Sequence, residues 1–294
     1  YVQHAVDSGL NVDHVAPRIS FFFNAHNNFF EEIAKFRVAR KLWATTMSDR
    51  FGARDERSKK MRFHAQTSGV TLTAQQPYNN VVRTTLQALA AVLGGANSLH
   101  VNALDEALAL PTREAALLTL RTQQILAHET GIPSVIDPFG GSYYLETLTS
   151  ALEASARAYF EEIDRRGGMV ASIEAGYPQR AIANSAYQEQ QAFDRGDSPL
   201  VGVNEYIDGA PLAVPTLLID DQVEAQQLEQ IESVRKSRNE TNVCRALEAL
   251  GKAAKSTDNL MPLIIEAVRT EATLGEMCDV LRSVWGEYEE SPVL

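Results

Sequence analysis

Polar side chains able to bind a ligand gather in two stretches of the first half of the chain. The first stretch is residues 62–80 and the second is residues 94–106. Their polar side chains include Arg62, His64, Gln66, Asn97, Asn102 and Glu106. Arginine forks onto phosphate, while amides and carboxylates pair with hydroxyl groups. Because these side chains lie around the ends of short apolar runs, the two stretches predict a binding site rather than a purely structural cluster.

Spacing suggests which of these side chains act together. His64 and Gln66 alternate on a predicted strand and therefore point to one face. A polar pair on a buried face needs a partner, which can be water, the backbone or a ligand. Asn102 and Glu106 are four residues apart just past a strand end, so both can face one ligand. The alternative for Glu106 is a place at a helix N-terminus, where the macrodipole favours acidic residues.

Another candidate pair, Arg18 and Ser20, lies at the start of a predicted strand or in the loop before it. A guanidinium and a hydroxyl at that spacing suit a phosphate group. Taken by itself, an arginine beside a proline is more often an ordinary surface charge.

Strand, loop and helix patterns alternate in the part of the chain that carries these residues. Short apolar runs begin near residues 19, 63, 97 and 134, and a helical pattern follows each run. Their starts fall about 35 to 45 residues apart, which is typical of βα units in a parallel sheet. The predicted fold class is α/β, a TIM-type (β/α)8 barrel of which residues 1–166 supply the second half. An open doubly wound sheet is the alternative.

The polar candidates follow the predicted strands, at the face where barrel enzymes keep their sites. Residues 167–294 are expected to form a linker and a helical extension that packs on the barrel. Two amphipathic helices are predicted between Gln226 and Trp285, separated by residues 256–259. Helical segments are expected on both sides of Pro111.

Composition limits the class of protein. The 294 residues are 45% hydrophobic and 22% charged, with a net charge of -11. No basic stripe is evident, so nucleic acid is not an expected partner. No apolar run is long enough to span a membrane, and no signal peptide is recognisable. The two cysteines, Cys244 and Cys278, are interpreted as small buried hydrophobic residues, which favours a reducing, cytoplasmic location.

Together with residues 17–23 and 137–144, the two polar stretches resemble the coenzyme B12-dependent acyl-CoA mutases, the methylmalonyl-CoA mutase family. The resemblance runs from about Pro17 to about Tyr206. It implies a B12-dependent isomerase that rearranges the carbon skeleton of a short acyl-CoA. The implied substrates are methylmalonyl-CoA, giving succinyl-CoA, or a relative such as isobutyryl-CoA or 2-hydroxyisobutyryl-CoA. The implied cofactor is adenosylcobalamin, whose cobalt–carbon bond breaks homolytically to start a radical reaction.

The same resemblance assigns roles to individual residues. Those implied to bind the acyl-CoA substrate are Arg18, Ser20, His64, Gln66 and Asn97, where Asn97 stands in place of the usual glutamine. Those implied to bind the cofactor are Gly69, Asn102, Glu106, Ala107 and Leu110. No metal ligand is expected, because the half-motif at His128 lacks the aspartate that should orient the ring.

The family's catalytic motifs are not recognisable in the chain. We therefore expect the catalytic residues in a missing N-terminal half of the barrel. Val70 replaces a tryptophan found in many single-chain relatives and so favours a separate small cobalamin-binding subunit in a hetero-oligomer. Two other functions remain open: a non-catalytic acyl-CoA-binding subunit that lost the radical machinery, and a different barrel enzyme that shares only the architecture.

Overall fold

The computed structural model describes residues 1–207 and 214–289. The chain divides into two compact units, Tyr1–Leu217 and Leu218–Leu294. The predicted division into a barrel part (1–166) and a packed extension (167–294) concerns the assembled protein and stays a prediction. The expected extension also includes residues 208–213 and 290–294, which lie outside the described residues.

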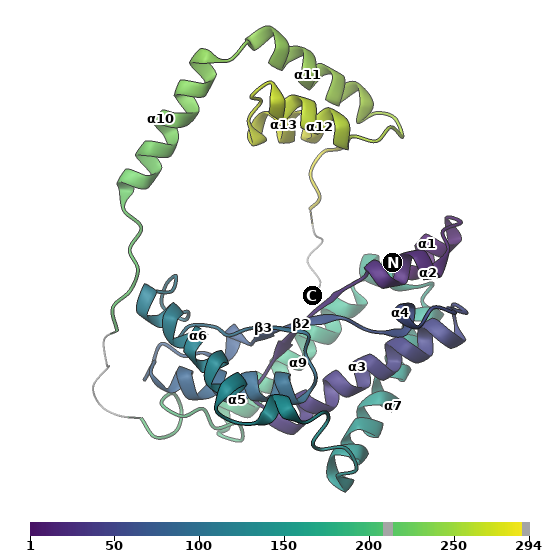
Figure 1. Ribbon diagram of the computed structural model, residues 1–294, viewed down its shortest axis with the longest axis vertical. Coiled ribbons are helices and arrows are strands. Elements are labelled where there is room, and N and C mark those ends of the chain that lie inside the picture. The colour runs from purple at the N-terminus through teal and green to yellow at the C-terminus, as the bar shows by residue number, and fades with distance from the viewer. Residues whose placement is uncertain (208–213, 290–294) are drawn as a thin grey trace. The chain divides into compact units, whose positions relative to one another are not determined.

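A three-stranded parallel sheet forms the centre of the first unit (Figure 1). Its strands are β1 (Phe21–Ala25), β2 (Phe63–Thr67) and β3 (Ser98–His100), in the order β1-β2-β3. In the register of the sheet, His64 pairs with Phe22 on one side and with Ser98 on the other. The predicted parallel sheet is confirmed for these three strands.

A helix follows each strand, as the hydrophobic periodicity predicts. These helices are α3 (Phe29–Asp49), α5 (Asn79–Leu93) and α6 (Arg113–His128), followed by α7 (Tyr143–Arg165). The other described helices of the first unit are α1 (Val2–Asp7), α2 (Val12–Val15), η1 (Ala16–Arg18), α4 (Glu56–Lys59), η2 (Gly69–Thr71), η3 (Ile132–Ser134), α8 (Met169–Glu174) and α9 (Tyr177–Asp194). Helix α5 ends at Gly94 and Gly95, where the positive φ of Gly95 turns the chain toward β3.

Apolar side chains from one face of the sheet pack against α3 and α5. The buried members of this layer are Ala25, Phe36, Phe63, Ala65 and Ala91. A second layer joins α3 and α5 to α7 through Ile33, Ala34, Ala90 and Leu145, and α7 lies beside α3 (Figure 1). Because consecutive helices cover the same face, the sheet is singly wound over this segment. A doubly wound sheet would place helices on both faces.

Two expectations about local structure are wrong. The run 134–136 is not a fourth strand: residues 132–134 form a 3-10 turn, and Ile136 is 96% exposed. A short apolar run becomes a strand only when a neighbouring strand pairs with it, and among the described residues none does. The segment just before Pro111 is a series of turns instead of a helix.

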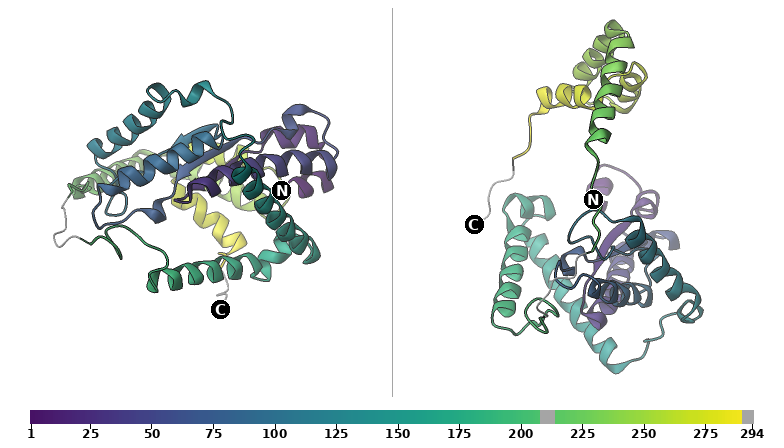
Figure 2. Two further views of the ribbon diagram at one scale, coloured as in Figure 1. Left: turned by 90° about the horizontal axis from the view of Figure 1, so that it is seen from below. Right: turned by 90° about the vertical axis from the view of Figure 1, so that its left-hand side faces the viewer.

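The described residues of the second unit form four helices, drawn green to yellow in Figures 1 and 2. They are α10 (Asp221–Ser237), α11 (Glu240–Ala253), α12 (Met261–Arg269) and α13 (Leu274–Trp285). The sequence predicted two helices over this range. Each splits at a capping residue: Asn239 caps α11, and Thr273 forms a capping box with Glu276 at the start of α13.

Two side chains of the second unit differ from expectation. Both Cys244 and Cys278 are exposed, because they lie on the outer faces of α11 and α13. Arg238, in a run of charged residues, is 4% exposed at its side chain and binds Glu276 at 2.6 Å. In the part of the chain that the structure describes, no helix has the length and hydropathy needed to cross a membrane.

Candidate functional site

The sheet face opposite α3 and α5 carries mostly polar side chains. They come from alternate positions of the three strands: Phe22, Asn24, His64, Gln66, Ser98 and His100. His64 and Gln66 point to this same face, as their spacing predicts. The Nδ1 atom of His64 lies 2.7 Å from the hydroxyl of Ser98, and the Phe22 ring lies 5.0 Å from the imidazole. Neighbouring strands therefore hold His64 in place from both sides.

A cluster of polar groups forms where β2 and β3 end, and we call Gln66, Gly69, Asn102 and Glu106 the carboxyl-edge cluster. Asn102 is only 1% exposed. Its Oδ1 accepts a 2.8 Å hydrogen bond from Gln66 Nε2, and its backbone N–H donates to Thr67 Oγ1. Its Nδ2 is buried and has no hydrogen-bond partner among the described residues. A buried amide donor without a partner is costly, so this geometry suits a ligand acceptor.

Gly69 leaves the space beside that amide open. A Cβ atom at Gly69 would lie 3.1 Å from Asn102 Nδ2 and 3.1 Å from Glu106 Oε1. The φ of Gly69 is not positive, so the glycine is needed for space and not for an unusual backbone conformation. A donor and an acceptor therefore face one small opening that a side chain would fill.

The carboxylate of Glu106 is partly desolvated. Burial raises its pKa, while the nearby His100 and a hydrogen bond from the backbone of Ala103 oppose that rise. Glu106 lies in a turn, and the next helix begins only at Arg113, so the helix-terminus alternative for this residue is wrong. An amide donor beside a carboxylate acceptor can bind two neighbouring hydroxyl groups, one from each side.

The other cofactor candidates, Ala107 and Leu110, continue the same turn. Both are exposed, Leu110 at 57%. Their role in binding stays a prediction.

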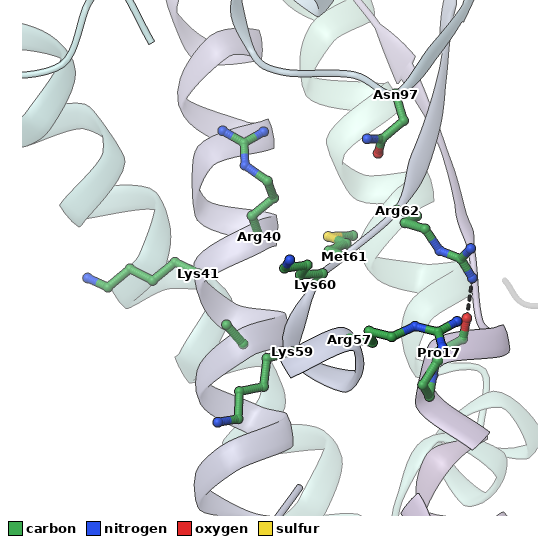
Figure 3. A pocket seen from close by; sticks show the side chains of 10 residues that line it. Pro17, Arg40, Lys41, Arg57, Lys59, Lys60, Met61, Arg62 and Asn97 are labelled. Atoms are coloured by element: carbon green, nitrogen blue, oxygen red, sulfur yellow. Dashed lines mark hydrogen bonds between the residues drawn. The ribbon is translucent and has the colours of Figure 1, made fainter. Parts of the chain in front are cut away.

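At the opposite edge of the sheet, where the strands begin, lies a pocket of about 620 Å³ that we call the basic pocket (Figure 3). It is lined by Pro17, Arg40, Lys41, Ala44, Arg57, Lys59, Lys60, Met61, Arg62 and Asn97. Its lining contains arginines and lysines but no carboxylate. The absence of a basic stripe inferred from the composition is thus wrong locally, because folding gathers cations that the net charge of -11 conceals.

Several of these cations are not neutralised. Burial lowers the pKa of Arg40, whose guanidinium donates to a backbone carbonyl. Arg62 donates to the carbonyl of Pro17, as Figure 3 shows. Among the described ion pairs, only Lys41 and Lys59 of the lining have carboxylate partners. The unpaired cations make the pocket attractive to an anion with several charges.

The sequence-predicted substrate residues fall in different places. Asn97 lines the basic pocket, but its Oδ1 accepts a 2.9 Å hydrogen bond from the backbone N–H of Phe63 and so holds the start of β2. Arg18 is the last residue of η1, and Ser20 lies between η1 and β1. Both are exposed, and neither lines the pocket. The guanidinium of Arg18 donates to the backbone carbonyl of His14.

His64 and Gln66 alternate along β2 and share its open face, and Arg62 directly precedes the strand in the same alternation, so this segment connects the two sites. Five residues of strand span about 17 Å. One extended ligand can therefore reach from the basic pocket past His64 and Gln66 to the carboxyl-edge cluster.

Most of the basic pocket was not recognised from the sequence. Four cations within residues 57–62 are a visible signal, but the acidic composition outweighed it. Arg40 and Lys41 come from the middle of α3, and only the packing of α3 beside the sheet brings them there. Among the described residues, no group of three or more histidine, cysteine or acidic side chains is placed to hold a metal ion.

Comparison with known proteins identifies the family of the chain. The family model described as methylmalonyl-CoA mutase matches residues 1–287. The chain is 45% identical over 295 residues to the 2-hydroxyisobutanoyl-CoA mutase large subunit of Aquincola tertiaricarbonis, covering 100% of this chain and 52% of that protein. It is 45% identical to the methylmalonyl-CoA mutase of Rhizobium meliloti (strain 1021), covering 99% of this chain and 41% of that one.

A third relative, the methylmalonyl-CoA mutase of Escherichia coli (strain K12), is 44% identical over 98% of this chain and 40% of its own length. The chain belongs to the methylmalonyl-CoA mutase family. It spans about half the length of the curated relatives it matches.

Proposed function

We propose that this chain supplies the second half of the substrate-binding (β/α)8 barrel of an adenosylcobalamin-dependent acyl-CoA mutase. The enzyme is an intramolecular transferase that rearranges the carbon skeleton of a short acyl-CoA. It acts together with the N-terminal half of the barrel and a separate small cobalamin-binding subunit. The singly wound parallel sheet and the 45% identity to mutases support this proposal.

The unpartnered amide of Asn102 is the observation that carries the cofactor assignment. A ribose hydroxyl can accept from Asn102 Nδ2, and its neighbour can donate to the carboxylate of Glu106. Gly69 provides the room, and the residues present thus fit the adenosyl group of the cofactor. When bound, adenosylcobalamin supplies the radical chemistry, while this chain's residues orient the adenosyl group and exclude water.

Substrate binding is assigned to the open sheet face and the basic pocket. The cations of the pocket bind the phosphates of coenzyme A, with Arg18 and Ser20 contributing from the neighbouring loop. The thioester arm then lies along β2, where His64 and Gln66 donate hydrogen bonds to it. This direction brings the acyl group to the carboxyl edge, next to the adenosyl site.

The acyl group itself is left open among close relatives. Methylmalonyl-CoA, 2-hydroxyisobutyryl-CoA and isobutyryl-CoA are the candidates, and the first two match the names of relatives. A non-catalytic acyl-CoA-binding role is not favoured, because the carboxyl-edge cluster keeps its amide, its carboxylate and its open glycine. The cytoplasmic location stays a prediction.

Val70 supports the proposed division into subunits. It is 86% exposed directly beside Gly69, so an apolar side chain faces outward at the rim of the adenosyl site. We expect the cobalamin-binding subunit to cover it. The assembly is then a hetero-oligomer in which the cofactor lies between two chains.

Glu106→Gln in the assembled enzyme tests the cofactor assignment. The substitution keeps size but removes the charge, and a hydrogen bond to a charged group contributes about 1.5–3 kcal/mol. We expect turnover to fall roughly ten- to a hundred-fold, with weaker adenosylcobalamin binding and an unchanged KM for the acyl-CoA. Arg18→Ala should raise that KM and leave cofactor affinity intact.

Glu129→Gln, an exposed carboxylate at the end of α6, is the matched control and should change neither quantity. Normal turnover and cofactor affinity in Glu106→Gln would overturn the cofactor assignment.

A further inference from the structure

Helix α5 carries two buried amide side chains that face the loops around the carboxyl-edge cluster. Asn80 is 0% exposed and Gln87 is 1% exposed. They are seven residues apart, close to two helical turns, so they lie on the same side of the helix. Amides in a helix interior add little to helix formation, and burying them is costly unless every polar atom is paired. Their hydrogen bonds therefore indicate what they do.

Asn80 joins the loop after β2 to the turn after β3. Its Oδ1 accepts from the backbone N–H of Thr73 at 3.1 Å, and its Nδ2 donates to the Thr73 carbonyl at 2.9 Å. The same Nδ2 donates to the carbonyl of Leu104 at 2.9 Å. Leu104 stands between Asn102 and Glu106, so the amide is attached to the segment that carries both.

Gln87 joins the loop after β1 to the loop after β2. Its Oε1 accepts from the backbone N–H of Ser68 at 3.1 Å, next to Gly69. Its Nε2 donates to Asn27 Oδ1 at 2.6 Å and to Thr71 Oγ1 at 2.7 Å. The loops after three successive strands are thus linked through one helix.

Arg83 reinforces the hydrogen bonds by which Asn80 joins the loop after β2 to the turn after β3. Its guanidinium donates to Asn80 Oδ1 at 2.8 Å and to Thr73 Oγ1 at 3.0 Å. It also donates to the backbone carbonyl of Val201, and burial lowers its pKa. The oxygen of Asn80 is therefore fully used, which fixes the orientation of the amide and aims its nitrogen at the two carbonyls.

We propose that Asn80 and Gln87 are positioning residues that set the separation of the three loops and so hold Gly69, Asn102 and Glu106 around the adenosyl group. The assignment of the ligand rests on the proposed function, whereas the linkage of the loops does not. A fully paired amide network of this kind specifies one loop arrangement, because any shift leaves buried polar groups unpaired.

Isosteric variants separate this role from simple stability. Asn80→Asp replaces the donor that faces Thr73 and Leu104 by an acceptor, and Gln87→Glu does the same toward Asn27 and Thr71. Thr84→Val is the matched control. Thr84 is 2% exposed on the same helix, between the two amides, and its hydroxyl bonds only to backbone carbonyls of α5.

Hydrogen exchange of the full-length large subunit, measured without cofactor, provides the first test. Asn80→Asp should speed exchange about tenfold or more in residues 71–76 and 102–109 and leave residues 26–28 unchanged. Gln87→Glu should instead speed exchange at residues 26–28 and 68–72 and leave residues 102–109 unchanged. Thr84→Val should show neither. Equal acceleration throughout the sheet in all three variants would overturn the proposal.

Cofactor affinity of the assembled enzyme provides the second test. We expect Asn80→Asp to weaken adenosylcobalamin about tenfold and hydroxocobalamin, which lacks the adenosyl group, less than about twofold. The result to compare is the ratio of the affinities for adenosylcobalamin and hydroxocobalamin. If this ratio is unchanged in Asn80→Asp but changed in Glu106→Gln, the positioning role is overturned. If the affinity ratio is unchanged in Glu106→Gln, the proposed cofactor site is refuted instead. The hydrogen-exchange pattern by itself would then test whether the amides link the loops.

Discussion

Removing one cation from the basic pocket should weaken binding of a phosphate-bearing substrate and little else. Arg62 is the informative position, because it directly precedes β2 and lies two residues before His64 in the alternation along the chain. Its guanidinium donates to the Pro17 carbonyl and has no carboxylate partner among the described ion pairs. The remaining N–H groups of the guanidinium are therefore available to bind an anion.

The expected size of the effect follows from that exposure. A hydrogen bond to a charged group contributes about 1.5–3 kcal/mol when it is buried. Arg62 is exposed, so we take the lower end, about 1.5 kcal/mol, which corresponds to a change in affinity of roughly tenfold. Arg62→Ala should thus raise the KM for the acyl-CoA about tenfold. Arg62→Lys keeps the charge but loses the forked guanidinium, so its KM should lie between those of the unsubstituted enzyme and Arg62→Ala.

The assay compares two substrates in the assembled enzyme. One is the acyl-CoA, and the other is the same acyl group on pantetheine, which lacks the phosphates. Only the KM of the acyl-CoA should rise in Arg62→Ala. The difference in this KM between Arg62→Ala and the unsubstituted enzyme should shrink with added salt. Arg121→Ala, an exposed arginine on α6, is the control. An equal rise for both substrates would mean that Arg62 supports the fold of the pocket and does not bind phosphate.

Two further outcomes are expected. Gly69→Ala should lower adenosylcobalamin affinity without loss of thermal stability, because its Cβ would enter the opening between the amide and the carboxylate. The hydrogen bond from Arg238 is the main cause that lowers the pKa of Glu276 from 4.5 to about 2. This pair therefore stabilises the second unit fully above about pH 4.5, and the stabilisation is lost as the pH falls toward 2. Glu276→Gln should therefore lower the free energy of unfolding of that unit by about 1–2 kcal/mol at pH 7 and should not lower it at pH 2, as measured by hydrogen exchange. The control is Glu266→Gln, which removes a carboxylate from an exposed ion pair and should leave the free energy of unfolding unchanged.

Local patterns in the sequence were sufficient for the strands and for most of their helices. Short apolar runs identified β1, β2 and β3, and the 3.6-residue period identified α3, α5, α6 and α7. These signals are local, since each depends on residues that are neighbours along the chain. The fourth run, 134–136, carried the same signal and failed, because a strand also needs a partner that local pattern cannot reveal.

Spacing along one element also predicted part of the site. The shared face of His64 and Gln66 follows from the two-residue period of a strand. The closeness of Gly69 to Asn102 and Glu106 does not, because 33 and 37 residues separate them and only pairing of β2 with β3 brings their loops together.

The interactions that hold the site in place were decided by tertiary structure alone. Asn80 and Gln87 read as ordinary polar positions of an amphipathic helix, yet both are buried against loops far away in sequence. Likewise, the cations of α3 join those near Arg62 only because the helix packs beside the sheet. The sequence by itself thus determined which elements form and which faces they present. The side chains that meet across those faces were determined by the packing of elements distant along the chain, since burial and hydrogen-bond satisfaction apply to the whole fold.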